Sequence, residues 1–391
     1  MKVLVLVPGL DPARGGMASA ATNMLIAARE AGVECVVVVP DHGGSESTRT
    51  LIDILEAAGV VVHAVPTLTR PRMVAYRWGI SPAQARWTAR NIGGFDVVHV
   101  HGAWGIGPLS GLTIGRLAGK PIVVTAHESL TAFDIDDSRS AFRRRQKLLL
   151  KALYLRYTTL FMLTSQLEAH DSLPLSAPQR TVHYPVVHAD APVREPRARG
   201  RGRDLKVGFL ARIDPKKNLD LLIDAMAEVP DYVRLVVAGE GPADLVESLR
   251  QRADHLGVTG RIEWLGFVSP GDRASFLEGL DLLAMPSAFE SFGLSAAEAM
   301  LEGVPVLVSE RTGIAEVIGR HGGGKVTEAD TRCIALAINE LDADRSLLSK
   351  MGRLGQKAVR AELTYTRIGQ VIRTSYEEVL RSAGKRGRPQ E

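Results

Sequence analysis

Short, uninterrupted apolar runs alternate with longer amphipathic stretches along most of the chain. Runs without polar positions are typical of strands that are buried on both faces of a parallel sheet. The amphipathic stretches between them predict helices that cover the sheet, which gives a doubly wound α/β fold. In the first half, strands are predicted at residues 3–7, 33–39, 60–65, 97–100, 122–125 and 160–164, and the first helix at residues 17–31.

The alternation is interrupted at residues 189–204, which are rich in Pro, Arg and Gly and lack an apolar period. Such a segment is typical of a linker. We therefore predict two Rossmann-like domains, residues 1–188 and 205–364, that face each other across a cleft. Ligands of such folds bind at the carboxyl ends of the strands. In the second half, strands are predicted at residues 207–210, 235–238, 262–265, 282–285 and 306–308.

Composition restricts the class of protein. The chain has 391 residues, of which 45% are hydrophobic and 24% charged, as expected for a globular protein of two domains. Only Cys35 and Cys333 are present, which indicates a reducing compartment and no structural zinc. Neither a signal peptide nor a membrane span is predicted, so we expect a cytoplasmic protein. The net charge of +4 is modest, and we expect no nucleic-acid partner.

The most informative stretch is residues 282–308. Pro286 stops an apolar strand, and the loop that follows carries Glu290 between two phenylalanines. A helical pattern then starts at Ser295. The start of this helix exposes backbone N–H groups, which suit an anion and above all a phosphate.

Two glutamates lie in this stretch, Glu290 in the loop and Glu298 in the first helical turn. Carboxylates at both places could bind hydroxyl groups while the amides between them hold a phosphate, an arrangement that fits a sugar nucleotide. The alternative for Glu298 is a capping box with Ser295. The alternative for Glu290 is a solvated loop residue.

Residues 290–300 read Glu-Ser-Phe-Gly-Leu-Ser-Ala-Ala-Glu-Ala-Met, and residues 303–306 read Gly-Val-Pro-Val. This pattern resembles the E-x7-E signature of retaining glycosyltransferases with the GT-B fold, in particular family 4. The resemblance implies that a sugar moves from a nucleoside diphosphate sugar to an acceptor hydroxyl with retention of anomeric configuration, as in hexosyltransferases.

The resemblance also assigns roles within this stretch. Glu290 is expected to bind the donor sugar as a catalytic residue, and Glu298 the ribose. The backbone at Phe292, Gly293 and Leu294 is expected to bind the diphosphate. In this fold the last helix, here residues 365–382, commonly crosses back to the first domain. We expect residues 383–391 to be a disordered tail.

Arg212, Lys216 and Lys217 follow a predicted strand and precede a helix. Cations at a helix start oppose the helix dipole unless a bound polyanion is shared. The segment resembles the G-R-x(4)-K-G element of the family, with Ala211 in place of the first glycine and Asn218 in place of the last. Asparagine tolerates the left-handed conformation that this turn needs. The resemblance assigns Arg212 and Lys217 to the diphosphate.

Other segments of the second half complete the resemblance to a nucleotide pocket. They are the G-x-G-P turn with Gly239 and Gly241, the segment Gly266, Phe267 and Val268 beside the nucleobase, and the closing loop with Thr312, Gly313, Ile314 and Glu316.

Gly15 and Gly16 precede the first helix, where a backbone without side chains can approach a ligand closely. A plain turn is the alternative. In similar glycosyltransferases a glycine pair at this place faces the donor phosphate and the acceptor. By resemblance, Gly16 is assigned to the diphosphate and Gly15 to the acceptor.

Histidines follow two predicted strands of the first half. We expect His99 to be a core residue and His101 and Trp104 to lie further out, at the mouth of the cleft, where they bind the acceptor. No third ligand accompanies the histidines, so no metal site is predicted. His127 has an ordinary alternative as a hydrogen-bonding loop residue. The resemblance makes it a catalytic residue near the donor sugar, although Glu128 replaces the family's usual Asp.

Two further segments have competing interpretations. Asp134 and Asp136 form a D-x-D pattern, the metal signature of the other large glycosyltransferase fold, but their polar context predicts an exposed loop. Residues 142–157 predict a helix with a leucine-rich face and a basic face. Packing on its own domain is one interpretation. Contact with an anionic membrane, where a lipid-linked acceptor would reside, is the other.

The resulting hypothesis is a glycosyltransferase that needs no metal and no other cofactor, in cell-surface glycan, glycolipid or small glycoside synthesis. Its partners are a nucleotide-sugar donor and a glycan, lipid-linked or small-molecule acceptor, with an optional peripheral position at the inner face of the membrane. A sugar-nucleotide epimerase of the same fold and a non-catalytic sugar-nucleotide or glycan binder remain alternatives. A nicotinamide dehydrogenase is disfavoured, because neither half carries the glycine fingerprint with its following acidic residue.

Overall fold

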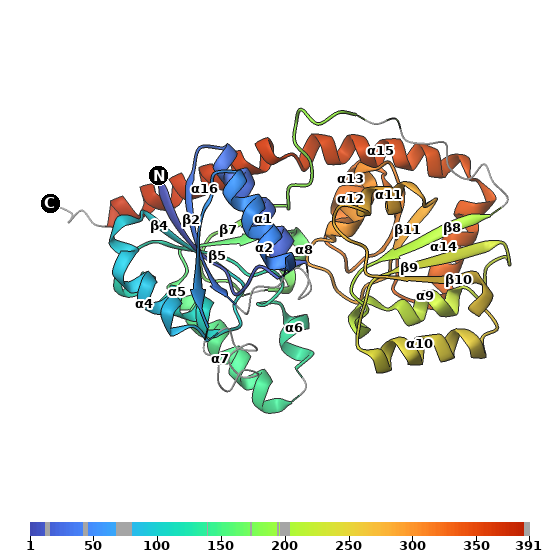
Figure 1. Ribbon diagram of the computed structural model, residues 1–391, viewed down its shortest axis with the longest axis horizontal. Helices are drawn as coiled ribbons and strands as arrows, with labels where there is room; N and C mark the ends of the chain where they lie inside the picture. Colours follow the sequence, from blue (N-terminus) through green and yellow to red (C-terminus); the bar gives the residue numbers. More distant parts are fainter. Residues whose placement is uncertain are drawn as a thin grey trace. The chain divides into compact units, whose positions relative to one another are not determined.

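The computed structural model describes residues 1–11, 16–41, 46–67, 80–138, 140–172, 174–193, 195 and 204–386. The chain divides into two compact units, Met1–Pro185 with Tyr365–Glu391 and Val186–Thr364 (Figure 1). The sequence placed the boundary after residue 188. The structure places it after Pro185, because the N–H groups of Val186 and Val187 donate to the Leu363 carbonyl at 2.8 and 3.4 Å.

A parallel sheet forms the centre of the first unit, with the strand order β3-β2-β1-β4-β5-β6-β7. Its strands are β1 (Lys2–Leu6), β2 (Glu34–Asp41), β3 (Val61–Pro66), β4 (Val97–His101), β5 (Ile122–Thr125), β6 (Leu160–Leu163) and β7 (Gln179–Thr181). The strand order reverses between β1 and β4, which pair in parallel from Val3 opposite Val97 to Leu6 opposite Val100. All four of these side chains are fully buried. In open α/β sheets, ligands bind beyond the carboxyl ends of the strands at such a reversal.

The last helix of the chain belongs to this first unit. Gly369 lies against α1, so close that a Cβ on it would be 2.1 Å from the Ala27 carbonyl oxygen, and Arg373 donates to the Ala31 carbonyl at 3.0 Å. The helix continues to Arg386, so the tail predicted from residue 383 begins too early. The helices of the unit are α1 (Met17–Glu30), α2 (Glu46–Ala57), α4 (Pro82–Asn91), α5 (Ile106–Leu117), α6 (Ala132–Asp136), α7 (Ala141–Tyr157), α8 (Gln166–Asp171) and α16 (Tyr365–Arg386), with the 3₁₀ turn η2 (Ile92–Gly94).

The second unit is built around a parallel sheet with the strand order β10-β9-β8-β11-β12-β13. Its strands are β8 (Leu205–Leu210), β9 (Val233–Ala238), β10 (Ile262–Gly266), β11 (Leu282–Met285), β12 (Val306–Ser309) and β13 (Gly324–Thr327). The order reverses between β8 and β11. Around the sheet are α9 (Leu219–Ala225), α10 (Ala243–His255), α11 (Arg273–Glu278), α12 (Leu294–Leu301), α13 (Ala315–His321), α14 (Thr331–Ala343) and α15 (Ser346–Glu362), with the 3₁₀ turns η3 (Pro215–Lys217) and η4 (Thr259–Arg261).

The two doubly wound domains that the sequence predicts are confirmed, and the differences lie at the sheet edges. Strands β7 and β13 were not predicted, because edge strands need no continuous apolar run. In β7 the residues Gln179 and Arg180 are exposed, and β13 carries Lys325. Part of the predicted linker is held in place, since Arg360 donates to the Ala191 carbonyl at 2.9 Å and to the Pro192 carbonyl at 2.7 Å.

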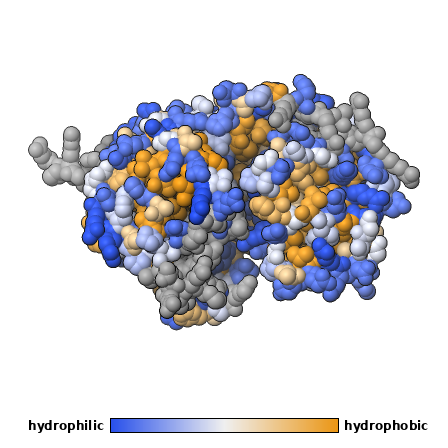
Figure 2. Space-filling model, viewed as in Figure 1, coloured by the Kyte–Doolittle hydropathy of each residue, from blue (hydrophilic) through white to orange (hydrophobic). Residues whose placement is uncertain are grey.

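The surface of both units is mixed in polarity. Figure 2 shows hydrophilic residues over most of the visible face, with hydrophobic patches on each unit. Apolar atoms at the surface are usual for globular proteins, so exposure alone marks no site. Among the helices of the described residues, none combines the length and the apolar character that a bilayer-spanning segment needs.

Candidate active site

Two loops of the second unit meet where the strand order reverses. The cationic turn after β8, residues 211–218, and the loop after β11 are joined by two hydrogen bonds. Asn218 donates its side-chain amide to the Pro286 carbonyl at 2.9 Å, and the Ala288 N–H donates to the Lys216 carbonyl at 2.8 Å. Asn218 has a φ of +52°, which confirms the left-handed turn expected from the sequence.

Lys217 and Glu290 form an ion pair at this junction, with side chains that are 13% and 19% exposed. Burial raises the pKa of Glu290, and the cations of Lys217, Lys216 and Arg212 more than offset this, so the pKa lies below its usual value. The Arg212 guanidinium also lies 3.2 Å from the Asp214 carboxylate. In the absence of ligand, an ionised carboxylate therefore lies at the cationic centre that the sequence assigned to a diphosphate.

Helix α12 begins at Leu294, directly after Gly293, whose φ of +102° is left-handed. A Cβ on Gly293 would lie 2.9 Å from the Thr312 methyl carbon. No side chain of the described residues caps this helix, so the capping box between Ser295 and Glu298 is not formed. An uncapped helix N-terminus beside a cationic turn is suited to an anion.

Glu298 instead pairs with Arg273 at the start of α11, at 3.2 Å between Nη1 and Oε1. Burial raises the pKa of Glu298, and Arg273 offsets this only in part. Arg273 was not singled out from the sequence. A lone arginine 25 residues before its partner carries no local pattern that could have identified it.

Glycines form the wall next to the cationic turn. The Gly239 N–H donates to the Gly266 carbonyl at 2.7 Å, which joins the ends of β9 and β10. A Cβ on Gly239 would lie 1.8 Å from the Ala211 carbonyl oxygen, and one on Gly241 would lie 2.3 Å from that of Ile213. The predicted G-x-G-P turn therefore packs backbone against backbone on the cationic turn.

Phe267 and Val268, predicted beside the nucleobase, directly follow β10. Phe267 is 54% exposed and Val268 is half-buried. An exposed aromatic ring next to the glycine wall can stack on a planar base.

The predicted closing loop is tied to the Glu290 loop by its backbone. The Gly313 N–H donates to the Glu290 carbonyl at 2.9 Å, and the Ile314 N–H donates to the Phe292 carbonyl at 2.5 Å. Glu290 is thus held from two sides, by Lys217 through its side chain and by the closing loop through its backbone. The structure brings together every charged residue that the sequence assigned to the diphosphate and the donor sugar within this unit.

The first unit holds a chain of hydrogen-bonded rings at the ends of β4 and β5, in which His101 and Tyr184 are buried and His127 is half-buried. His127 Nε2 lies 2.8 Å from His101 Nδ1, and His127 Nδ1 lies 2.6 Å from the Tyr184 hydroxyl. His101 is only 1% exposed, so its predicted place at the mouth of a cleft is wrong. His99 is a core residue, as predicted, with its two nitrogens at 2.7 Å from the Tyr376 hydroxyl and 2.8 Å from Thr125 Oγ1.

These imidazoles are uncharged at neutral pH. Burial lowers the pKa of His101 to about 3. Burial also lowers the pKa values of His99 and His127, and the neighbouring histidines add to the shift. His127 can therefore donate or accept one hydrogen bond at each nitrogen, but it does not carry the positive charge of an imidazolium. Both of its nitrogens already have protein partners, so a sugar hydroxyl would have to replace one of them.

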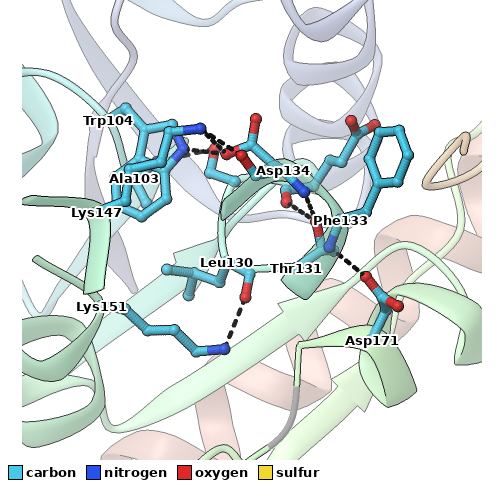
Figure 3. Close-up of polar contacts among 11 residues, drawn as sticks. Ala103, Trp104, Leu130, Thr131, Phe133, Asp134, Lys147, Lys151 and Asp171 are labelled. Carbon is cyan, nitrogen blue, oxygen red and sulfur yellow. Dashed lines mark hydrogen bonds and ion pairs between the residues drawn. The ribbon is translucent and has the colours of Figure 1, made fainter. Parts of the chain in front are cut away.

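Trp104 is part of a polar network with α6 and α7 (Figure 3). Its indole N–H donates to Asp134 Oδ2 at 2.6 Å, and the Lys147 ammonium donates to the same oxygen at 2.8 Å. Asp134 is half-buried inside α6, so the exposed loop predicted for it is wrong. Thr131 caps this short helix by accepting from the Asp134 N–H at 3.1 Å, and a Thr three residues before an Asp could have indicated it.

The glycine pair before α1 is described only in part. Gly15 lies outside the described residues. Gly16 is the N-cap of α1, and a Cβ on it would have no described atom within 4 Å. The assignment of Gly16 to the diphosphate therefore remains a prediction. In the described part of the chain, no three His, Cys, Asp or Glu side chains gather as metal ligands.

Two family models match the chain. Residues 14–186 match the family described as Glycosyltransferase Family 4, and residues 195–358 match the one described as Glycosyl transferases group 1. The chain belongs to glycosyltransferase family 4. One relative is a D-inositol 3-phosphate glycosyltransferase of Mycobacterium sp. (strain KMS), 32% identical over 271 residues, or 66% of this chain and 59% of the relative.

Another relative is a 2-deoxystreptamine glucosyltransferase of Streptomyces kanamyceticus, 30% identical over 259 residues, or 60% of this chain and 63% of the relative. The chain thus spans about three fifths of the length of these family members.

Two solved structures share the fold. HepE of Anabaena, in complex with UDP and glucose, has a TM-score of 0.76 at 21% identity, covering 97% of this chain and 100% of its own. Sucrose-phosphate synthase of Thermosynechococcus elongatus has a TM-score of 0.73 at 18% sequence identity, and the match covers 98% of this chain and 100% of the synthase chain. The GT-B fold class is confirmed.

Proposed function

We propose that the protein transfers a sugar from a nucleoside diphosphate sugar to an acceptor hydroxyl, with retention of anomeric configuration. The observation that carries the proposal is the meeting of Arg212, Lys217 and Glu290 beside the uncapped start of α12, at the strand-order reversal of the second unit. Cations and a helix N-terminus bind a diphosphate, and a carboxylate next to them binds sugar hydroxyls.

The hard step of such a transfer is the departure of the nucleoside diphosphate. Arg212, Lys217 and the backbone amides of residues 292–294 would stabilise the negative charge that grows on it, without a metal ion. Binding of the diphosphate would displace Glu290 from Lys217 and free its carboxylate for the donor sugar. Glu298, held by Arg273, would bind the ribose.

His127 would act from the first unit as a neutral hydrogen-bonding group near the donor sugar. We place no covalent intermediate on the enzyme, and we propose displacement on the same face, assisted by the leaving phosphate. The glycosyltransferase activities of the two relatives, and the complex of HepE with UDP and glucose, support this class of donor and acceptor. The acceptor belongs to a cell-surface glycan, a glycolipid or a small glycoside.

The proposal is tested by thermal unfolding with nucleoside diphosphates and their sugars. A ligand present at about 100 times its Kd stabilises the folded protein by about 2.7 kcal/mol, so we expect a rise in Tm of several degrees. The same rise is expected with a chelator present, because the cationic turn replaces a metal. If no nucleoside diphosphate raises Tm, or if the chelator abolishes the rise, the proposal is wrong.

We further propose that α7 contacts an anionic membrane, where a lipid-linked acceptor would lie. The sequence favoured packing of this helix on its own domain, and the structure bears this out in part, since Tyr154 is fully buried and Leu155 packs against the core of the unit. Lys147 and Lys151 also point inward. Lys151 donates to the Leu130 carbonyl at 2.8 Å (Figure 3), and it donates to the Ser172 carbonyl at 2.8 Å. The opposite face is apolar and exposed, with Phe142 77%, Leu148 43%, Leu149 64% and Leu153 38% exposed.

The same helix carries arginines at positions 143, 144, 145 and 156, of which Arg144 is paired with Asp136. A helix with exposed leucines and several arginines fits the interface of an anionic bilayer, where apolar burial and charge attraction add. A second copy of the chain would bring like charges together and is the less favourable occupant.

Replacing Phe142 and Leu149 together by serine is expected to weaken binding to phosphatidylglycerol vesicles at least tenfold, because burial of each side chain contributes about 1.5–3 kcal/mol. Vesicle cosedimentation measures the partition. Leu336→Ser is the matched control, since this leucine of α14 is 51% exposed in the other unit. Equal binding of wild type and double variant, or equal binding to uncharged vesicles, contradicts the membrane proposal.

A further inference from the structure

Two consecutive residues after β5 have backbone conformations that side chains disfavour. His127 has a φ of +49° and Glu128 a φ of +77°. For residues other than glycine, the left-handed region costs about 1–2 kcal/mol each, and such strain persists only where surrounding contacts fix it. Contacts on the next turn contribute, since the Thr131 N–H and hydroxyl donate to the Glu128 carbonyl at 2.9 and 2.6 Å.

The stronger restraint on this strained pair comes from Glu168 on α8. Its side chain is fully buried, and Oε1 accepts from the Glu128 N–H at 2.6 Å. Oε2 accepts from the Thr164 N–H and from the Thr164 hydroxyl, both at 2.7 Å. A carboxylate that accepts three short hydrogen bonds is strongly held. It therefore fixes the strained backbone of residues 127 and 128 to the end of β6.

The ring of His127 is fixed as well. Tyr184 bonds to Nδ1 and His101 to Nε2, and both partners are at most 5% exposed. A hydrogen bond between two neutral imidazoles needs one donor and one acceptor. When the Tyr184 hydroxyl donates to Nδ1, the proton of His127 is on Nε2 and His101 Nδ1 must accept it. The tautomer of His127 therefore determines that of His101, and the Tyr184 hydroxyl selects one of the two combinations by donating to Nδ1 or accepting from it.

We propose that Glu168 and Tyr184 are positioning residues for His127: Glu168 sets the backbone from which the ring projects, and Tyr184 sets its orientation and tautomer. The proposal rests on the proposed function, in which His127 meets the donor sugar. On this proposal the half-buried His127 keeps one defined protonated nitrogen at neutral pH, where an exposed imidazole would exchange between forms.

The test is Tyr184→Phe, which removes one oxygen and keeps the ring. We expect the side-chain ¹⁵N chemical shifts of His127 and His101 in the ligand-free protein to change together, because the selected tautomer is lost. With a nucleotide-sugar donor we expect kcat to fall about ten- to hundredfold, as for a misplaced reacting group. The donor KM should stay within about twofold, because the nucleotide residues lie in the second unit.

Tyr376→Phe is the matched control. Its hydroxyl is also buried against an imidazole Nδ1, but that ring is His99, which has no hydrogen bond to His127 among the described residues. We expect it to leave kcat and the His127 shifts unchanged. Glu168→Gln is the second variant: an amide nitrogen cannot accept the hydrogen bond that a carboxylate oxygen accepts, so kcat should fall while the fold, followed by circular dichroism, is kept.

Unchanged His127 shifts in Tyr184→Phe, or an equal loss of kcat in Tyr376→Phe, would overturn the positioning role. A change in the shifts without a loss of kcat would also overturn it, while leaving the glycosyl transfer intact. If the wild type itself shows neither nucleotide binding nor transfer, the proposed function fails, and the ¹⁵N spectra still report whether Tyr184 sets the tautomer.

Discussion

Lys217→Met is expected to lower kcat/KM for a nucleotide-sugar donor by about 10²–10³-fold, the range found when one group that stabilises a developing negative charge is removed. Lys217 is the ion-pair partner of Glu290 and lies in the turn that is hydrogen-bonded to the loop before α12. Its loss removes a positive charge that would bind the diphosphate, and it leaves Glu290 without its ion-pair partner. The pKa of Glu290 should therefore rise towards its ordinary value.

Glu290→Gln separates these two effects. If Glu290 acts on the donor sugar, the single variant should lose kcat while the affinity for the free nucleoside diphosphate stays the same or increases, because Lys217 no longer needs to be released. The double variant Lys217→Met with Glu290→Gln should lose less than the product of the two single losses, since the two side chains are in direct contact. Steady-state kinetics and calorimetric binding of the nucleoside diphosphate measure the two quantities.

Lys325→Met is the control for removing a lysine from an ion pair. Lys325 pairs with Glu340, whose side chain is 64% exposed, at the edge strand β13 and away from the cationic turn. Exposed pairs contribute about 0–1 kcal/mol, so neither stability nor activity should change measurably. A value of kcat/KM in Lys217→Met that stays close to that of Lys325→Met contradicts the assignment of Lys217 to the diphosphate.

The sequence predicted the second unit in more detail than the first. Its signals are local: the left-handed Asn218, the glycines that pack on backbone, and the two glutamates around a helix start all follow from a few adjacent residues. The partners of those residues are not local. Lys217 and Glu290 are 73 positions apart, and only the strand order β8-β11 brings them together.

The first unit shows what a periodic pattern does not determine. The helical period of residues 142–157 predicts α7 correctly, but it does not say which face is buried. Lys147 and Lys151 can face the domain because Asp134 and two backbone carbonyls accept hydrogen bonds from their ammonium groups. Leu148, Leu149 and Leu153 are left exposed. His101 was likewise misplaced, because its hydrogen-bond partner His127 follows another strand and leaves no trace in the residues around position 101.

Gly239→Ala is expected to have the largest effect on stability. The new Cβ would lie 1.8 Å from the Ala211 carbonyl oxygen, which is backbone and cannot rotate away. Inserting a carbon into a packed site costs about 1–3 kcal/mol, and the φ of +153° adds strain for any residue with a Cβ. The ends of β8 and β9 must then separate, which moves Arg212 away from Glu290. We therefore expect a loss of about 3 kcal/mol or more in the free energy of unfolding of the second unit, by the same estimates.

Gly257→Ala measures separately how much of that loss in unfolding free energy comes from the left-handed backbone conformation. Gly257 has a φ of +69°, and a Cβ on it would have no described atom within 4 Å, so only the left-handed cost of about 1–2 kcal/mol should appear. Urea unfolding, followed by the fluorescence of Trp264 on β10, reports on the second unit in both variants. Gly239→Ala should also weaken nucleoside diphosphate binding at least tenfold, whereas Gly257→Ala should leave it unchanged. If the two alanine variants unfold at the same urea concentration and bind the nucleotide equally well, the close contact of the glycine wall with the cationic turn does not organise the site.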